Sequence, residues 1–360
     1  MKIEEILAVK HLSVEFQTSG GKKQVVKDVS LSLRQGEVLA LVGESGCGKT
    51  VLCRSILKLL PKSASVTGEA VQYKDQNLIR YNEKEMQQIR GQGIAMVFQD
   101  PQGTLNPTMT VGNQIEEAIL LHENALKQKK REKDFEKNKK KSAKERAIEL
   151  MELVGIKDAE QRYDLYPYHF SGGMRQRCVL ATALASNPKL LIADEPTTAL
   201  DVTIQAEILK LLKKLQKELN LSILFITHDL GVVAQIADRV AVMQDGNIVE
   251  LEEAKQLFTA PKHSYTKKLL HDHPYYMYRN ESELISESEL HEKLVEISHL
   301  SYFYPLDRKR VFQAVKDVSF EIRRDEIFGL VGESGSGKST VGKCLMGILS
   351  PQAETFSYDG

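Results

Sequence analysis

The sequence has few of the features that mark a secreted, metal-clustered or membrane-spanning chain. Its 360 residues include four cysteines, and none of them stands in a CxxC or Cys/His spacing suited to a zinc site or a disulfide framework. A reducing cytosol is therefore the expected environment. No stretch reaches the about 18 apolar residues that a membrane-spanning helix requires, and the opening segment MKIEEILAVKHL lacks the apolar core of a signal peptide. If the protein serves a membrane, we expect it to do so from outside the bilayer.

A net charge of one sign is absent as well. Lys plus Arg total 49 and Asp plus Glu total 49, so the chain has no overall field that would steer it onto nucleic acid or anionic lipid. One segment departs from this balance, because basic residues far outnumber acids from Lys127 to Arg146. Such a segment is either a solvated extension or a contact with lipid headgroups, and the lack of a defined apolar face favours the first.

The sequence does contain an internal repeat. The stretch VVKDVSLSLRQGEVLALVGESGCGKTVLCRSIL from Val25 matches AVKDVSFEIRRDEIFGLVGESGSGKSTVGKCLM from Ala314. In each copy, alternating residues predict short strands, GEVLALV or DEIFGLV predicts a buried strand, and a glycine-rich loop then opens a helix. Between the copies, the polar and acidic segment from Asn280 to Glu292 suits a solvated linker.

The loop GESGCGKT, from Gly43 to Thr50, stands between the predicted strand and helix of the first copy. There, a GxxxxGK[ST] sequence turns its backbone N–H groups inward, and the helix N-terminus adds the positive end of its dipole, so the loop binds phosphate. Lys49 places a positive charge on the β and γ phosphates, and the Thr50 hydroxyl can ligate Mg²⁺. The nucleotide-binding residues predicted here are Gly43, Ser45, Gly46, Cys47, Gly48, Lys49, Thr50 and Val51.

Two consecutive acids follow a second apolar strand. In KLLIADEP from Lys189, Asp194 and Glu195 stand at the carboxyl end of the strand, where open parallel sheets hold ligands. Asp194 is positioned to hold Mg²⁺, directly or through water, and Glu195 to accept a proton from the attacking water. The loop alone could belong to a GTPase, a kinase, a helicase or a transporter ATPase, but the absence of an NKxD motif disfavours a GTPase.

A second anion-binding surface is predicted at FSGGMRQR, which precedes a helical pattern. Ser171 can cap that helix, while Gly172 and Gly173 leave its N-terminal amides bare. Taken alone, SGG is also compatible with a capped loop that has no function. The order of the motifs decides between these readings, because the loop, Gln99, SGG and the Asp-Glu pair all precede Asp201 and His228 in one unit.

From about Ile6 to about Leu270, this order of motifs resembles the ATP-binding subunit of an ABC transporter. The resemblance implies an α/β fold of the P-loop NTPase class, with a parallel core sheet and helices, an antiparallel β subdomain and a helical subdomain that carries the signature sequence FSGGMRQR. That signature departs slightly from the commonest form, with Phe for Leu and Met for Gln, but keeps its serine and both glycines. ATP and Mg²⁺ are the implied cofactors.

The resemblance also assigns roles that the residues alone do not. It implies that Phe16 stacks on adenine and that Gln99 in VFQDPQ is the lid glutamine, near Mg²⁺ and the membrane contact. It places Asp201 in the D-loop ALD and makes His228 in ITHD the switch histidine at the γ-phosphate. The expected catalytic set is Glu195, His228 and Gln99, and the expected Mg²⁺ set is Thr50, Gln99 and Asp194.

Two further stretches are similar to one branch of the family. DPQGTLNPTMTVGNQI from Asp100 and APKHSYTKKLL from Ala260 resemble the DPxxxLNP and PxHxYTxxLL segments of oligopeptide, dipeptide and nickel importers. Some members of that branch carry a cysteine cluster near the C-terminus that holds an iron–sulfur centre. This chain has no cysteine between Cys178 and Cys344, so we expect no iron–sulfur cluster.

The resemblance implies an ATP-hydrolysing subunit, peripheral at the cytoplasmic face of the cell membrane, that powers import of peptides or nickel. The partners that it implies are a second ATP-binding domain from the same or a related subunit, two transmembrane permease subunits and, indirectly, an extracytoplasmic solute-binding protein. Nucleic acid is not expected. A soluble ABC-type ATPase acting on nucleic acid or ribosomes without a permease is the alternative, slightly favoured by the Lys-rich segment. A non-hydrolytic regulatory subunit would require a damaged site, whereas the motifs of the first unit are intact.

The predicted domains follow the repeat. Residues 1–262 are expected to form an ABC ATP-binding domain, 263–292 the C-terminal extension of this branch and a linker, and 293–360 the N-terminal fragment of a second such domain. The second copy keeps Tyr304 for adenine and the loop from Gly332 to Ser339, but has no signature, Asp-Glu pair or switch histidine. Such an incomplete copy is expected to expose sheet edges and apolar surface.

Overall fold

A computed structural model describes residues 4–129, 142–198, 200–272, 292–305, 310–332 and 335–359. The chain divides into two compact units, and each is described by itself. The first contains Met1–Leu200 and Ile204–Tyr278, and the second contains Arg279–Gly360 with Asp201–Thr203. The predicted linker from Asn280 to Glu292, apart from Glu292 itself, and most of the Lys-rich segment lie outside the described residues. Among the described helices, none combines the length and the apolar character that crossing a bilayer would need.

The core of the first unit is a six-stranded sheet, in the order β11-β10-β3-β9-β8-β7. Its strands are parallel except β11, which pairs antiparallel with β10. Every residue of β3 and β8 is buried, as expected for parallel strands covered on both faces, which explains their continuous apolar runs. The bounds are β3 (Val38–Val42), β7 (Ile94–Val97), β8 (Leu190–Asp194), β9 (Ser222–Thr227), β10 (Arg239–Gln244) and β11 (Asn247–Glu253).

Helices cover the sheet and bury alternate residues of its strands. Leu39 and Leu41 of β3 pack in one apolar cluster, while Ala40 and Val42 pack in another. The longest of these helices, α8, places apolar side chains at three- and four-residue spacing on its buried face, which is the helical period. The covering helices are α1 (Lys49–Ile56), α8 (Val202–Leu219), α9 (Leu230–Ile236), α10 (Ala254–Thr259) and α11 (Ser264–His271).

An antiparallel β subdomain packs against α1 and adds its apolar side chains to the cluster that contains Leu39 and Leu41. Its strands follow the order β2-β1-β5-β6, with β4 also pairing with β1. Their alternating apolar residues close over the same face as Leu39 and Leu41. The elements are β1 (Glu5–Thr18), β2 (Gly21–Arg34), β4 (Ala64–Thr67), β5 (Ala70–Tyr73), β6 (Gln76–Asn77), η1 (Leu78–Arg80) and α2 (Glu83–Ile89).

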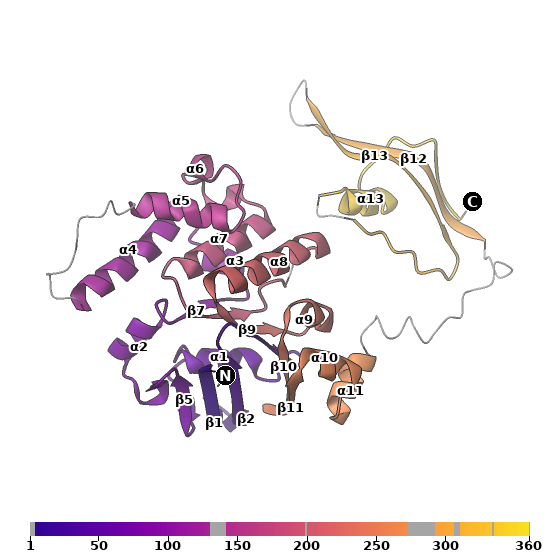
Figure 1. Ribbon diagram of the computed structural model, residues 1–360. Coiled ribbons are helices and arrows are strands. Elements are labelled where there is room, and N and C mark those ends of the chain that lie inside the picture. Colours follow the sequence, from indigo (N-terminus) through magenta and orange to yellow (C-terminus); the bar gives the residue numbers. More distant parts are fainter. Residues whose placement is uncertain are drawn as a thin grey trace. The chain divides into compact units, whose positions relative to one another are not determined.

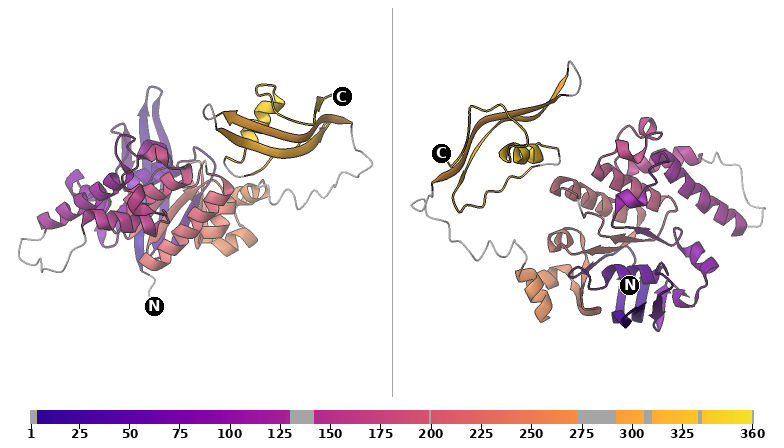
Figure 2. Two further views of the ribbon diagram at one scale, coloured as in Figure 1. Left: turned by 90° about the horizontal axis from the view of Figure 1, so that it is seen from above. Right: turned by 180° about the vertical axis from the view of Figure 1, so that it is seen from behind.

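A helical subdomain carries the predicted signature sequence. Figure 1 shows α4, α5, α6 and α7 gathered on the side of the core sheet away from β1 and β2, and the rear view in Figure 2 agrees. Gly112 lets α4 approach Tyr163, because a Cβ there would stand 2.2 Å from the ring. The elements are α3 (Pro101–Thr104), α4 (Val111–Lys129), α5 (Ala143–Leu153), α6 (Ala159–Arg162), η2 (Pro167–His169) and α7 (Gly172–Leu184).

The second unit repeats only part of this arrangement. It contains β12 (Lys293–Pro305), β13 (Val311–Arg323), α13 (Lys338–Leu345) and β14 (Thr355–Tyr358), with strand order β13-β12-β14. Antiparallel pairing of β12 with β13 and β14 matches the pairing of β1 with β2 and β5. A small apolar cluster of Ile297, Leu300, Val315, Val341 and Cys344 joins α13 to these strands.

The predicted buried strand in DEIFGLV of the second copy is not observed. Residues 326–332 form no strand, and the side chain of Val331 is 88% exposed, whereas its counterpart Val42 in the first unit is fully buried. The difference has a physical reason: β3 forms a strand because β9 and β10 hydrogen-bond to it on either side. No described segment of the second unit pairs with residues 326–332. The expected exposure of apolar surface is confirmed there by Ile327 and Val331.

The turn between β10 and β11 ties the sheet to the phosphate-binding loop. Asp245 and Gly246 both have positive φ, the geometry of a type I′ hairpin turn. The Gly246 N–H donates to the carbonyl of Cys47 at 3.1 Å, and the Gly246 carbonyl accepts from the Lys27 N–H at 2.8 Å. A Cβ at Gly246 would stand 2.5 Å from the Val25 carbonyl oxygen, so glycine is required on both conformational and steric grounds.

We expect Gly246→Ala to lower the free energy of unfolding by about 1–3 kcal/mol, because it adds a backbone clash to the penalty of a positive φ. Gly21→Ala is the matched control, since Gly21 has φ +110° but no heavy atom within 4 Å of its Cβ position. Thermal unfolding followed by circular dichroism compares the two variants with the unsubstituted protein. Equal losses in both variants would show that the Val25 contact carries no cost.

Candidate active site

The loop from Gly43 to Thr50 leaves the carboxyl end of β3 and leads into α1. A Cβ at Gly43 would stand 2.1 Å from the Met243 carbonyl oxygen of β10, so the loop passes close against the neighbouring strand. Gly48 has φ +109° and precedes α1 without a side-chain cap. The first amides of α1 are therefore left without a capping side chain, which is the arrangement that binds phosphate.

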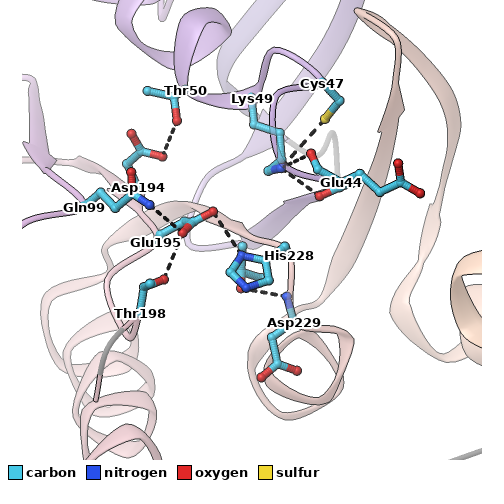
Figure 3. Close-up of polar contacts among 12 residues, drawn as sticks. Glu44, Cys47, Lys49, Thr50, Gln99, Asp194, Glu195, Thr198, His228 and Asp229 are labelled. Atoms are coloured by element: carbon cyan, nitrogen blue, oxygen red, sulfur yellow. Dashed lines mark hydrogen bonds and ion pairs between the residues drawn. The ribbon is translucent and has the colours of Figure 1, made fainter. Parts of the chain in front are cut away.

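Lys49 folds back over the loop, as Figure 3 shows. Its Nζ donates to the carbonyl oxygens of Gly43 at 2.7 Å and Glu44 at 2.8 Å, and it lies 3.7 Å from Sγ of Cys47. Lys49 is only 5% exposed. Within the described chain, the hydrogen bonds of this buried ammonium go to neutral carbonyls and a thiol, so its charge is available to phosphate oxygens.

Asp194 provides a buried carboxylate next to the loop. Its Oδ1 accepts a hydrogen bond from Oγ1 of Thr50 at 3.0 Å, and Asp194 is 0% exposed. Burial raises the pKa of Asp194, although the Thr50 hydrogen bond and the charge of Arg54 act in the opposite direction. In the described part of the chain, Oδ2 of Asp194 is buried without a hydrogen-bond partner. A carboxylate oxygen left open beside a hydroxyl fits Mg²⁺, which takes one or two protein oxygens and leaves its other positions to water and phosphate.

Glu195 lies at the centre of a hydrogen-bond network drawn in Figure 3. Its Oε2 accepts from Nε2 of Gln99 at 2.8 Å and from Oγ1 of Thr198 at 2.9 Å, and Nδ1 of His228 lies 3.1 Å from Oε1. Partial burial acts to raise the pKa of Glu195, but the hydrogen bonds from His228 and Thr198 and the charge of Lys49 outweigh it and lower that pKa. The carboxylate is therefore ionised near neutral pH and able to accept a proton.

His228 stands between the end of β9 and the start of α9. The next residue, Asp229, caps α9 by accepting from the N–H groups of Gly231 at 2.7 Å and Val232 at 3.2 Å. The N–H of Asp229 in turn donates to Oγ1 of Thr227 at 3.0 Å. These contacts hold the backbone before and after His228 in place. The His228 side chain is 54% exposed and faces Glu195.

The predicted signature forms the N-terminus of α7. Oγ of Ser171 caps the helix by accepting from the Met174 N–H at 3.3 Å. Gly172 is exposed, and Gly173 packs so closely on α8 that a Cβ would stand 2.4 Å from Cγ2 of Ile204. Among the described residues, no hydrogen bond joins this serine or its glycines to the loop of Lys49.

The remaining predicted residues lie on separate elements. Phe16 is on β1, half-buried, and packs against the cluster that includes α1. Gln99 follows β7 and reaches Glu195, while Asp201 stands directly before α8; Ala199 of the D-loop lies outside the described residues. Sequence reasoning missed Thr198, although its position three residues after Glu195 is the spacing that a turn brings together.

The comparisons with known proteins agree with this geometry. The family model described as ABC transporter matches residues 26–198 and 315–360. The oligopeptide transport ATP-binding protein OppD of Bacillus subtilis strain 168 is 51% identical over 286 residues, which cover 79% of this chain and 76% of that protein. The uncharacterized ABC transporter ATP-binding protein YejF of Escherichia coli K12 is 40% identical over 99% of this chain, and the match spans 65% of YejF.

Solved structures show the same fold. The dimeric structure of MJ0796, a bacterial ABC transporter cassette, matches with a TM-score of 0.57 at 27% identity, covering 69% of this chain and 98% of MJ0796. These findings and the site together identify the chain as a member of the ABC transporter family, and its first unit as the ATPase domain. They confirm the predicted fold class, and the family match at 315–360 supports the repeated second copy.

We expect Glu195→Gln to keep ATP binding and to lower the turnover number by about 100-fold or more, because the amide cannot accept the proton of the attacking water. Glutamine keeps the shape of the side chain and an oxygen that accepts from Thr198 or Gln99. Phosphate release at saturating ATP measures the turnover. Hydrolysis at the unsubstituted rate would remove Glu195 from the role of base.

Lys49→Ala is the contrasting variant, because it removes the charge that we place on the β and γ phosphates. This variant is expected to lose ATP affinity itself, whereas Glu195→Gln loses turnover. Equilibrium binding of a fluorescent ATP analogue separates the two effects. A normal affinity in Lys49→Ala would contradict the placement of the phosphates in this loop.

Proposed function

We propose that this chain is the ATP-hydrolysing subunit of an importer of oligopeptides or dipeptides, bound to permease subunits at the cytoplasmic face of the membrane. The observation that carries the proposal is the convergence of Lys49, Asp194, Glu195 and His228 at the carboxyl ends of neighbouring strands. The relatives supply the substrate class. OppD and the dipeptide transport ATP-binding protein DppD of Bacillus subtilis are each 51% identical to this chain, and DppD of Lactococcus lactis is 47% identical.

Two further comparisons bear on the choice between peptides and nickel. The glutathione import ATP-binding protein GsiA of Escherichia coli K12 is 39% identical over 99% of this chain, although the match spans 60% of GsiA. Glutathione is a tripeptide derivative, so its importer also handles a small peptide. The names of these relatives refer to oligopeptides, dipeptides and glutathione, so peptides are the proposed substrate class.

The proposed roles follow from the contacts. The loop amides and Lys49 bind the phosphates of ATP, and Thr50 and Asp194 hold Mg²⁺, with Gln99 nearby. Bound between these residues and the phosphates, Mg²⁺ would supply positive charge that offsets the negative charge of the phosphoryl group. Glu195 takes the proton of the water that attacks the γ-phosphorus, and His228, fixed by its bond to Glu195, faces the γ-phosphate. We further propose that Phe16 stacks on adenine.

We propose that the site is completed by a second ATP-binding domain. Ser171 and its glycines present a capped helix terminus that no described hydrogen bond joins to the loop of their own domain. An opposing domain, from the same or a related subunit, brings such a terminus to the γ-phosphate, with Asp201 at the junction. The ATP-binding cassette MJ0796, solved as a dimer bound to ADP and Pi, matches this chain with a TM-score of 0.55 at 26% identity, covering 69% of this chain and 98% of MJ0796.

The second unit is proposed to be the N-terminal part of a second ATP-binding domain. The family match at 315–360 and the 99% coverage of this chain by YejF and GsiA support this assignment. The described part of its loop shares two features with the first loop: Gly337 has φ +97° directly before α13, and Nζ of Lys338 donates to the Gly332 carbonyl at 2.6 Å. The described second unit contains no counterpart of the Asp194–Glu195 pair.

A composite site predicts that specific ATPase activity depends on protein concentration. We expect the activity per molecule to fall on dilution, because each pocket needs Ser171 from an opposing domain. Phosphate release measured over a dilution series, with sedimentation velocity at the same concentrations, checks this dependence. Full activity of a strictly monomeric sample at every dilution would contradict it.

The substrate class is tested by transport. Expression with its permease and solute-binding subunits in a peptide-uptake-deficient host is expected to restore uptake of labelled di- and tripeptides, and Glu195→Gln in the same complex is expected to abolish it. Uptake of labelled nickel without peptide uptake would reject the peptide assignment. Tight, salt-sensitive RNA or DNA binding without permease association would reject the importer function.

A further inference from the structure

The segment PKHSYTKKLL packs beside the phosphate-binding loop, and its contact there is not explained by the proposed function. Tyr265, at the start of α11, is 9% exposed and lies in an apolar cluster with Val42 of β3 and Val240 of β10. Its hydroxyl oxygen accepts a hydrogen bond from the Glu44 N–H at 3.2 Å. A buried ring thus brings one polar atom to the loop that holds Lys49.

The peptide unit between Gly43 and Glu44 connects Tyr265 to Lys49. Its carbonyl accepts from Nζ of Lys49 at 2.7 Å, and its N–H is the group that donates to Tyr265. Because a trans peptide is planar, with its C=O and N–H directed to opposite sides, fixing the N–H also fixes the direction of the carbonyl. Hydrogen bonds at the two ends of one peptide also polarise each other. The hydroxyl of Tyr265 therefore helps to orient the Gly43 carbonyl, which accepts the hydrogen bond from Lys49.

Tyr265 is itself held in place by a buried carboxylate. Glu250 of β11 is 7% exposed, and its two oxygens accept from the N–H groups of Lys262 at 2.8 Å and His263 at 3.0 Å. His263 then caps α11, because its Nδ1 accepts from the Tyr265 N–H at 3.2 Å. The contacts run without a break from Glu250, through the start of α11, to the peptide unit beside Lys49.

We propose that Tyr265 is a positioning residue for Lys49, and that α11 sets the affinity of the loop for ATP and ADP through this contact. The inference rests on the proposed function, since it assigns nucleotide phosphates to the loop. It differs from a purely structural role in one respect. Packing alone would place the ring of Tyr265 in the core but would give its hydroxyl no influence on nucleotide binding.

The test is Tyr265→Phe in the full chain, which keeps the ring and removes the hydroxyl. We expect the Kd for Mg²⁺-ADP and Mg²⁺-ATP, measured by isothermal titration calorimetry, to rise by about 3- to 10-fold, as the loss of one hydrogen bond implies. The kcat at saturating ATP is expected to stay within about 2-fold, because the hydroxyl makes no contact with Glu195 or His228.

Tyr163→Phe is the matched control. The Tyr163 hydroxyl also makes side-chain hydrogen bonds, to Glu116 and to Oδ1 of Asn113, but these lie in the helical subdomain. Its nucleotide Kd is expected to equal that of the unsubstituted protein. A rise in Kd in this control as large as that in Tyr265→Phe would overturn the proposal, since removal of any buried hydroxyl would then suffice.

A second variant tests the path to α11. In Glu250→Gln one carboxylate oxygen becomes an NH₂ group, which cannot accept from the second of the two amides. Nucleotide affinity is expected to fall, and to fall less than additively when Glu250→Gln is combined with Tyr265→Phe, because both act through one contact. Strict additivity of the two effects would contradict the path.

Two outcomes separate this inference from the proposed function. If Tyr265→Phe lowers the thermal midpoint without nucleotide but leaves both Kd values unchanged, the residue is structural and the inference fails, while ATP binding at the loop stands. If Lys49→Ala binds both nucleotides with normal affinity, the phosphate site itself is misplaced and the proposed function fails.

Discussion

The site depends on one constraint, which is the burial of parallel strands on both faces of the core sheet. β3, β8 and β9 are fully buried and lie side by side, so their carboxyl ends are fixed relative to one another. The loop of Lys49 follows β3, and His228 follows β9. Asp194 is the last residue of β8, and Glu195 comes directly after it. Thr50 and Asp194, which are 144 positions apart in the chain, therefore meet within hydrogen-bond distance.

Much of the first unit could be predicted from sequence, because its signals are local. A continuous apolar run predicts β3, the glycine-rich loop follows it, and a helix pattern then predicts α1. The spacing inside each motif predicts which residues, Lys49 and Asp194, bind phosphate and Mg²⁺. The contacts of Thr198 and Tyr265 could not be predicted in the same way. The first depends on the rotamer of Glu195, and the second joins residues 221 positions apart in the chain.

The second unit shows where local signals fail. DEIFGLV has the composition of β3, and by pattern alone it is a buried strand, yet residues 326–332 form none. A strand of a parallel sheet forms only when neighbouring strands and covering helices are present, because its backbone hydrogen-bonding groups and both its apolar faces need partners. The antiparallel pair β12 and β13 does form, because a strand and its hairpin partner are close in sequence.

The hairpin turn at Gly246 and the hydroxyl of Tyr265 have a consequence for biosynthesis. Both hold the phosphate-binding loop from positions about 200 residues downstream of it. On the ribosome, the first strand of the sheet and its loop are translated long before β9, β10 and α11 exist. Until those elements emerge, the nascent segment VLALV lacks its neighbours, as DEIFGLV does in the described second unit. Assembly of the ATP pocket is thus a late event of folding, and protection of VLALV by a chaperone would matter most during that interval.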